Sequence, residues 1–423
     1  MNILCVTVEL PYVTGGGGGN LRQYHLLRYI ARRHHVTVIS PVLPWEWDRL
    51  DELRALGVDL RPVPHRLPQE RTRIRWSYWL DHLRTAANPR PFEVARFDLL
   101  RPAIAREIRQ AVRERSFDVV QVDHSQVAGW AHWCPRQVPR VLILHNLLSV
   151  RTRRAAERAP RRRRLLARWD WFKTALYERR ALRWFDWCVA VSEQEYDQIR
   201  RLAPEAAVAV VPNGVDLTYF SPSRMDDVRR PYHAVFIGSL DYPPNAEGIV
   251  SFVEYGWPLV RSKSPGATLA IVGRHPTPDV QALDRSSGVQ VVGPVTDVRP
   301  YLREASAVIV PLWQGAGTRL KVLEALAMGK GVVSTSVGAE GIAAVSGRHL
   351  LLAETPPALA EQVVALFQHP DVQDNLGREG RALATARYGW DSLASTLESV
   401  YEQASAHRDL RRPLHQDTQL QHE

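Results

Sequence analysis

The chain has 423 residues, 45% of them hydrophobic, which is enough for two domains with separate cores. It carries 55 Lys and Arg against 45 Asp and Glu, and the formal net charge of +10 favours phosphorylated small molecules, anionic lipids or nucleic acid as partners. The three cysteines are widely spaced, which suits a reducing compartment and gives no zinc-binding pattern, and no apolar run is long enough to span a bilayer.

The first apolar run, Asn2–Val8, predicts a buried strand. No basic segment precedes it, so we do not interpret it as a signal peptide and expect a cytoplasmic protein. A glycine run follows, and Leu21–Arg33 predicts a helix. A glycine loop between a strand and a helix exposes backbone N–H groups to a phosphate or sugar, and the alternative is a surface hinge. The candidate contacts are Gly15, Gly16, Gly17 and Gly18.

Short β-branched runs alternate with helical stretches along the chain, as in parallel sheets that are buried on both faces. The pattern predicts an α/β protein with two doubly wound, Rossmann-like sheets. The further strands that we expect are His35–Pro41, Phe117–Val122, Val141–His145, Trp187–Ser192, Ala207–Val211, Ala234–Gly238, Thr268–Gly273, Val289–Gly293 and Ala307–Pro311.

Turn residues in Pro212–Tyr232 mark the expected junction between the two domains. We place the first domain at residues 1–212 and the second at residues 213–388. A last helix is expected at residues 389–406, and the polar residues 407–423 are expected to form a disordered tail.

Polar side chains follow two of the expected strands in the first domain. Asp123 and His124 come after Phe117–Val122, and His145 ends the next strand. Ligands of such sheets bind at the carboxyl ends of the strands, so these three residues are the candidate catalytic groups. A purely structural role for either histidine is the alternative.

A sharper pattern occupies Pro311–Thr335 in the second domain, where a strand, a glycine loop and a helix follow one another. We expect the helix to begin near Thr318, with Arg319 and Lys321 at its start. Two cations at the positive end of a helix dipole are unfavourable unless an anion binds there, and a diphosphate fits. Glu324, just over one turn further, suits a ribose because a carboxylate accepts hydrogen bonds from two hydroxyls.

This segment resembles the donor-binding motif of retaining glycosyltransferases of the GT-B architecture, in particular family 4 and its exopolysaccharide-associated subset. Three further segments match in the same order: Val211–Pro222, Phe236–Asn245 and Val333–Gly341. The resemblance implies two domains facing a cleft, a nucleotide-sugar donor on the second domain and an acceptor on the first. It also implies no metal or other cofactor, and a last helix that returns to the first domain. The donor contacts that it implies are Gly238, Asn245, Gly317, Thr318, Arg319, Leu320, Lys321 and Glu324.

The sequence departs from the family pattern at two places. Many members have two glutamates eight residues apart in the donor motif, and here Ala316 occupies the first position, which in the family contacts the hexose. An Arg and Lys pair often follows the first strand of the donor domain, where this chain has Ser239 and Asn245. We expect Arg319 and Lys321 to supply that charge.

The segment Arg151–Arg168 contains nine arginines and one acidic residue, Glu157. After it, Leu165, Trp169, Phe172 and Leu176 recur at helical spacing, which predicts either a face packed on the core or a face that contacts anionic headgroups. The second alternative would place the protein at the inner face of a membrane. A second basic and aromatic patch comprises Arg71, Arg73, Arg75, Trp76, Tyr78 and Trp79.

The leading interpretation is a glycosyltransferase that moves a sugar, with retention, from a nucleotide-diphosphate-sugar to a glycan, a lipid-linked sugar or a small molecule. A nucleotide-sugar epimerase of the same architecture and a non-catalytic sugar-binding protein are alternatives. A nucleic-acid-binding protein would fit the charge but leaves the donor motif unexplained, so we expect no nucleic-acid partner.

Overall fold

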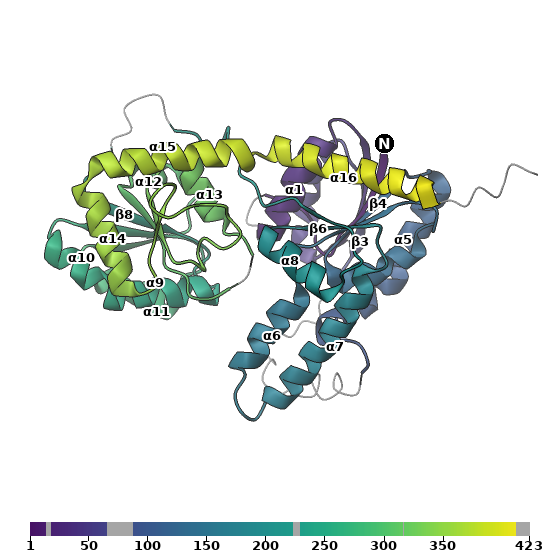
Figure 1. Ribbon diagram of the computed structural model, residues 1–423, viewed down its shortest axis with the longest axis horizontal. Coiled ribbons are helices and arrows are strands. Elements are labelled where there is room, and N and C mark those ends of the chain that lie inside the picture. Colours follow the sequence, from purple (N-terminus) through teal and green to yellow (C-terminus); the bar gives the residue numbers. More distant parts are fainter. Residues whose placement is uncertain (14–17, 66–87, 223–228, 316, 412–423) are drawn as a thin grey trace, which may run out of the picture. The chain divides into compact units, whose positions relative to one another are not determined.

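The computed structural model describes residues 1–13, 18–65, 88–222, 229–315 and 317–411 (Figure 1). The chain divides into two compact units. The first contains Met1–Val211 together with Ala394–Glu423, and the second is Pro212–Leu393. The glycines Gly15–Gly17, the patch from Arg71 to Trp79, and Ala316 lie outside the described residues.

The first unit is built on a parallel sheet with seven strands in the described part of the chain. Their spatial order is β3 (Asp59–Pro64), β2 (His35–Val42), β1 (Asn2–Val6), β4 (Val119–Asp123), β5 (Arg140–Ile143), β6 (Trp187–Ala190) and β7 (Val208–Val210). The helices are α1 (Gly18–Ile30), α2 (Leu50–Arg54), α4 (Phe92–Ala95), α5 (Arg101–Glu114), α6 (Leu148–Arg158), α7 (Arg164–Leu182), α8 (Glu193–Leu202) and, at the end of the chain, α16 (Trp390–Arg411), with 3-10 turns η1 (Pro44–Arg49), η2 (Asp98–Leu100) and η3 (Ser125–Trp133).

The second unit repeats the arrangement with six parallel strands among its described residues. Their spatial order is β10 (Val289–Gly293), β9 (Thr268–Val272), β8 (His233–Ile237), β11 (Ala307–Val310), β12 (Val332–Ser334) and β13 (Leu351–Leu352). The helices are α9 (Pro243–Tyr255), α10 (Trp257–Lys263), α11 (Pro278–Ala282), α12 (Arg299–Glu304), α13 (Leu320–Ala327), α14 (Pro356–Gln368) and α15 (Pro370–Arg387), with the 3-10 turn η4 (Leu283–Arg285).

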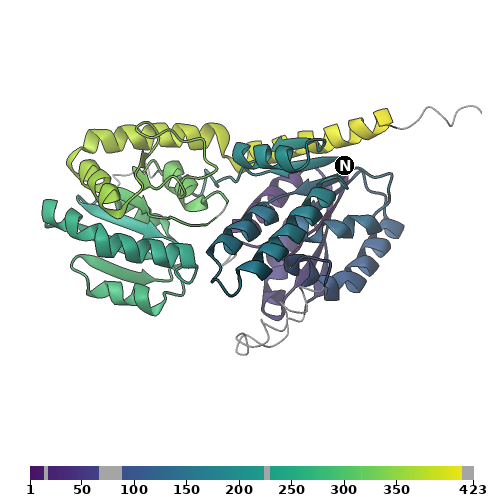
Figure 2. The ribbon, with the colours of Figure 1, turned by 60° about the horizontal axis from the view of Figure 1, so that its bottom comes forward.

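Apolar residues on both faces of each strand explain why helices cover both sides of each sheet. In β8, Phe236 belongs to a core cluster with residues of α9, α10 and α14, whereas the adjacent Val235 belongs to a second cluster with residues of α12, α13 and α15. Figure 2 shows the second sheet between its two helix layers. The expected α/β class with two parallel sheets is therefore confirmed.

Three strands, β3, β12 and β13, were not expected from the sequence. β3 contains Pro62 and Pro64 and pairs only with β2, at the edge of the sheet, where a residue without an N–H group is tolerated. β12 and β13 have three and two residues, too few to show a period.

The last helix, α16, continues to Arg411 and passes the end expected at residue 406. Its residues from Ala394 onward belong to the first unit. There Glu398 accepts hydrogen bonds from Arg33 at 2.8 Å and pairs with His34 at 3.1 Å, and the Tyr401 hydroxyl donates to Gln121. Among the described helices, none is both long and apolar enough to cross a membrane.

Candidate active site

Polar residues gather at the same topological position in both units. The strand order reverses between β1 and β4 in the first sheet and between β8 and β11 in the second. At such a switch point the two following loops diverge and leave room for a ligand at the carboxyl ends of the strands. The candidate residues of the sequence lie at these two places.

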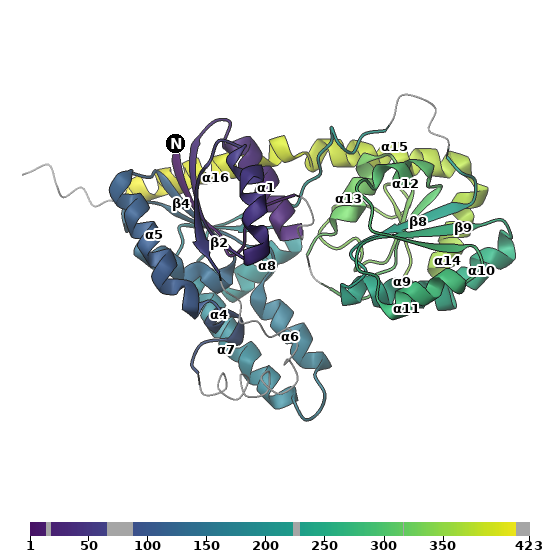
Figure 3. The same cartoon turned by 180° about the vertical axis from the view of Figure 1, so that it is seen from behind.

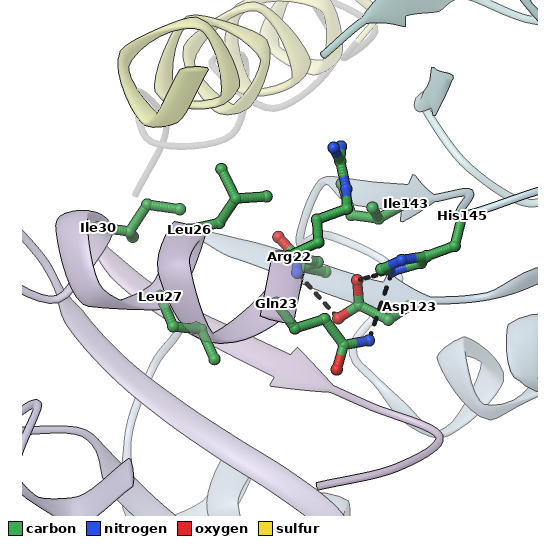
Figure 4. Close-up of a pocket in the computed structure, with 9 residues that line it drawn as sticks. Arg22, Gln23, Leu26, Leu27, Ile30, Asp123, Ile143 and His145 are labelled. Atoms are coloured by element: carbon green, nitrogen blue, oxygen red, sulfur yellow. Dashed lines mark hydrogen bonds and ion pairs between the residues drawn. The ribbon is translucent and has the colours of Figure 1, made fainter. Parts of the chain in front are cut away.

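In the first unit, Asp123, His124 and His145 come together as a cluster, hereafter the histidine cluster. The rings of His124 and His145 stack with centroids 4.1 Å apart, and Nε2 of His145 lies 3.5 Å from Oδ1 of Asp123. Gln23 of α1 approaches the same Nε2 atom at 3.4 Å, and Gln121 donates to Asp123 Oδ2 at 3.0 Å (Figure 4). The cluster therefore joins residues from β4, β5 and α1.

Burial shifts the pKa values of all three side chains of the histidine cluster. It lowers the pKa of His145 to about 3, with a contribution from the positive charge of Arg22, and it also holds the pKa of His124 well below 6.5. Burial raises the pKa of Asp123 to about 6. Both imidazoles are therefore neutral near pH 7 and can each donate one hydrogen bond and accept another.

His124 has an unusual backbone conformation, with φ of 73°, which side chains other than glycine rarely adopt. Its Nε2 atom is buried and has no hydrogen-bond partner among the described residues. Strained residues with an unsatisfied polar atom are concentrated at ligand sites. The combination favours contact with a ligand over a purely structural role.

Glu9, which sequence reasoning missed, lies beside the histidine cluster. A Cβ atom added to Gly19 would be 3.1 Å from Oε1 of Glu9 and 3.7 Å from Nδ1 of His145. Burial, together with the charges of Glu46 and Asp123, raises the pKa of Glu9 to about 7. The signal in the sequence is an acidic residue between the first strand and the glycine run. Of the candidate glycines, Gly18 is the first residue of α1.

In the second unit, Lys321, Asn245 and Gly238 meet above the end of β8. Lys321 Nζ donates to Asn245 Oδ1 at 2.8 Å and lies 4.5 Å from the centroid of the Phe236 ring. A Cβ atom on Gly238 would be 2.6 Å from Lys321 Nζ, so a side chain at this position would require the ammonium group to move. Asn245 is oriented by its Nδ2 atom, which donates to the carbonyl of Ser239 at 2.8 Å.

Burial, reinforced by the positive charge of Arg319, lowers the pKa of Lys321 to about 7. Burial also raises the pKa of Glu324 on the same helix to about 7, and the lysine charge only partly offsets that shift. An anion above Lys321 would restore its charge. The lowered pKa of Lys321 is thus the shift expected at a site that binds an anionic ligand.

The helix α13 begins at Leu320, two residues after the start that we expected near Thr318. Gly315 and Gly317 have φ of 116° and 84°, so the chain stays in a loop up to this point. Arg319 is the N-cap residue, and its guanidinium donates to the carbonyl of Gly317 at 2.5 Å. Lys321 therefore approaches the switch point, whereas Arg319 contacts its own loop. Thr318 is buried, and its Oγ1 atom has no hydrogen-bond partner among the described residues.

Arg274 is a second residue that sequence reasoning missed. It follows β9, the neighbour of β8, and its Nε atom donates to Oγ of Ser239 at 3.3 Å. The pairing of β8 with β9 brings this guanidinium beside Ser239, two residues after the end of β8. Spacing along the chain does not reveal it, because the contact depends on the strand order.

Comparisons with known proteins agree with this geometry. Residues 16–219 match the model of glycosyltransferase family 4, and residues 231–369 match that of glycosyl transferases group 1. A D-inositol 3-phosphate glycosyltransferase of Actinosynnema mirum is 30% identical over 329 residues, which cover 68% of this chain and 73% of that protein. The chain belongs to glycosyltransferase family 4.

Two further proteins, one compared by sequence and one by structure, are similar to this family 4 chain over nearly its whole length. An MMP alpha-(1->4)-mannosyltransferase of Mycolicibacterium hassiacum is 25% identical over 96% of the chain and 99% of its own length. The crystal structure of HepE from Anabaena in complex with UDP has a TM-score of 0.67 and 14% identity, covering 95% of this chain and all of HepE. The two parallel-sheet units are thus those of the GT-B architecture. Other curated relatives are matched over only 31% to 52% of their own length.

Proposed function

We propose that this family 4 protein is a glycosyltransferase that uses a nucleotide-diphosphate-sugar as donor. The observation that carries the proposal is the contact of Lys321 with Asn245 beside Gly238, at the switch point of the second sheet. A buried lysine with a lowered pKa and the first N–H groups of α13 suit a diphosphate. The UDP complex of HepE and the glycosyltransferases among the relatives support this choice of donor class.

Within the donor site, Lys321 is assigned to the diphosphate and Glu324 to the ribose. Glu324 is one turn further along α13 than Leu320, and a carboxylate accepts the stronger hydrogen bonds from vicinal hydroxyls. Gly317, Thr318 and Leu320 offer backbone N–H groups, and Arg319 is within reach of the same phosphates once its loop contacts exchange.

The transfer proceeds with retention in this proposal. The bond between C1 of the sugar and the diphosphate oxygen breaks, and the acceptor oxygen forms its bond to C1 on the same face. The acceptor proton passes to an oxygen of the departing diphosphate. Lys321 and the helix N–H groups stabilise the charge that develops on the leaving group, so the reaction needs no metal ion.

The histidine cluster is assigned to hydroxyl groups of the transferred sugar or of the acceptor. Neutral His124 and His145 and the carboxyl of Asp123 can donate and accept hydrogen bonds with such groups. The orphaned Nε2 atom of His124 supports this assignment. The acceptor class is a glycan or a lipid-linked sugar.

Calorimetry with UDP-, GDP- and ADP-sugars tests the donor assignment. The double variant Arg319→Ala with Lys321→Ala should bind its donor at least about 10-fold more weakly, since each charge-assisted hydrogen bond contributes ~1.5–3 kcal/mol. Arg285→Ala with Lys263→Ala, exposed residues of the same unit, is the matched control. Equal donor affinity in both double variants would remove the assignment.

Product analysis tests the reaction itself. Proton NMR of the product of an α-linked donor should show an α-linkage, and activity should survive treatment with EDTA. Conversion of the donor into a free epimer without acceptor would identify an epimerase. Donor binding without turnover, over a broad acceptor panel, would identify a sugar-binding protein.

A further inference from the structure

The helices α6 and α7 form an antiparallel pair in the first unit, here called the arginine hairpin (residues 148–182). Figures 1 and 3 show the pair extending away from the sheet of that unit. Its base is fixed by the buried carboxylate of Glu178, which accepts hydrogen bonds from the backbone N–H groups of Leu148 and Ser149 at 2.8 and 2.9 Å. The same carboxylate accepts from the hydroxyls of Ser125 and Ser149. The hairpin is therefore held at a defined angle to the unit.

The long helix of the hairpin, α7, has two different faces. Its inner face, which includes Ala181 and Leu182, packs into the core of the unit. Its outer face carries an apolar stripe of Leu165, Trp169, Phe172 and Leu176, with exposed fractions of 80%, 48%, 49% and 41%. The rings of Trp169 and Phe172 stack with centroids 5.8 Å apart. None of these four side chains belongs to the core cluster formed by the described residues of this unit, so that cluster does not account for the stripe.

Positive charge surrounds the apolar stripe. Arg151–Arg168 contains nine arginines and one glutamate, so this segment contributes +8, whereas the whole chain has a net charge of +10. Arg161, Arg162 and Arg164 are exposed at the tip of the hairpin, directly before Leu165. Solvated arginines alone do not explain why Leu165 is largely exposed and Trp169, Phe172 and Leu176 are about half exposed on one helix face.

We propose that the arginine hairpin docks on an anionic lipid membrane. Exposed tryptophan, phenylalanine and leucine on one helix face suit the boundary between headgroups and acyl chains, while the arginines contact lipid phosphates. Long arginine side chains can reach the headgroups while the helix lies at the surface. A nucleic-acid backbone would engage the arginines but offers no apolar contact for the exposed side chain of Leu165.

The proposed docking surface also has a consequence for the class of acceptor. α6 begins at Leu148, shortly after His145, and is capped by the same Glu178 that contacts Ser125, the residue that follows His124. A docked hairpin would hold the histidine cluster at a constant position relative to the bilayer. This last step rests on the proposed function and favours a lipid-linked acceptor, whereas the docking itself does not depend on catalysis.

Vesicle sedimentation with the full chain tests the charge contribution. The chain should bind vesicles of phosphatidylglycerol and phosphatidylcholine, bind pure phosphatidylcholine far more weakly, and lose affinity as salt is raised. The triple variant Arg161→Ser, Arg162→Ser, Arg164→Ser should bind anionic vesicles at least about 10-fold more weakly. The matched control replaces Arg106, Arg109 and Arg113, three exposed arginines of α5, with serine and should bind nearly as well as the unchanged chain.

A fluorescent label tests whether the apolar stripe enters the bilayer. The three cysteines are all buried, so Leu165→Cys provides a selectively labelled site. An environment-sensitive dye there should shift to shorter wavelength with anionic vesicles, and the same dye at Tyr255→Cys, on an exposed residue of the second unit, should not. The double variant Trp169→Ser, Phe172→Ser should reduce vesicle affinity about 10-fold while circular dichroism stays unchanged.

The results that overturn the proposal are distinct. Absence of binding to anionic vesicles, or equal binding by the two arginine triple variants, would refute a lipid surface. Binding of an RNA or DNA duplex without vesicle binding would assign the charge to nucleic acid. A dimer in sedimentation velocity that the Trp169→Ser, Phe172→Ser variant dissociates would assign the stripe to a second copy. If donor turnover is absent but vesicle binding is present, the proposed function fails and the docking surface stands.

Discussion

Lys321 Nζ donates a hydrogen bond to Asn245 Oδ1 at 2.8 Å, although the two residues are 76 positions apart. Gly238 lies beneath this contact and is the position that allows it, because a Cβ atom there would be 2.6 Å from the ammonium nitrogen and 2.8 Å from Asn245 Nδ2. Residues after β8, in α9 and in α13 thus depend on one another at a single point of the second unit.

Replacing Gly238 with alanine should displace Lys321 and weaken donor binding. We expect a loss of about 10-fold or more in affinity, as for the removal of one charge-assisted contact. Gly266→Ala is the control, because an added Cβ atom there meets no heavy atom within 4 Å. Calorimetry with the preferred donor measures both variants, and an unchanged affinity for Gly238→Ala would show that donor binding does not depend on the present position of Lys321.

Donor affinity should depend on pH through Lys321. Its pKa of about 7 means that the ammonium group is charged below that pH and must take up a proton on binding a diphosphate at higher pH. The Lys321 contribution to affinity should therefore be full well below pH 7 and fall roughly 10-fold or more by pH 8.5, whereas ionisation of Glu324 strengthens the ribose contact as pH rises. Glu324, with its own pKa of about 7, ionises in the same range. Lys321→Arg, which keeps its charge, isolates the lysine contribution and should flatten the profile.

The fold could be predicted from the sequence because short apolar runs that alternate with helical stretches are typical of parallel sheets buried on both faces. β10 has the predicted bounds, and β1, β2, β4 and β8 differ by one or two residues. The edge strand β3 was missed because Pro62 and Pro64 argue against a strand unless its place in the sheet is known. The direction of the apolar stripe on α7 was also undecided, because helical spacing defines a face but not what the face contacts.

The candidate site was predictable where its residues follow one another along the chain or follow the ends of neighbouring strands, as Asp123, His124 and His145 do. The loop and helix from Gly317 to Glu324 were found by their spacing, yet the distinct positions of Arg319 and Lys321 depend on where α13 begins. Arg274 was missed because its contact with Ser239 depends on the pairing of β8 with β9, about which spacing along the chain carries no information. Glu9 lies in the segment between β1 and α1, and a lone acidic residue there does not show that its side chain is buried beside His145.

Glu324→Gln should separate a ribose contact from a structural role. The substitution keeps the shape and removes the charge, so affinity for a ribonucleotide donor should fall by ~1–2 kcal/mol. A 2′,3′-dideoxy analogue of the same donor lacks the hydroxyls and should lose almost nothing. Both affinities come from one set of titrations, and equal losses for the two donors would assign Glu324 a structural role.

Gly19→Val should obstruct the histidine cluster without affecting the donor site. The side chain would press on the carboxylate of Glu9, 3.1 Å from the Cβ position, and reach toward His145. Turnover should fall at least several-fold while donor affinity and the thermal midpoint change little. Gly129→Ala, where the nearest atom is an ordinary 3.8 Å away, is the control in the same unit. Unchanged turnover for Gly19→Val would place the chemistry away from this cluster.

His145→Asn should change how stability depends on pH. Burial and the charge of Arg22 hold the pKa of His145 at about 3, so the folded chain keeps this ring neutral where the unfolded chain, with an ordinary histidine pKa near 6.5, takes up a proton. Stability is therefore lost as pH falls below about 6.5, and at pH 5 this one group removes roughly 2 kcal/mol. Asp123 and Glu9, whose pKa values are raised, act in the opposite direction in both chains. The stability difference between the unchanged chain and His145→Asn isolates the histidine, and chemical denaturation should show it shifting by ~2 kcal/mol in favour of the variant between pH 7.5 and pH 5. A difference that is constant with pH would mean that His145 is not held neutral by burial.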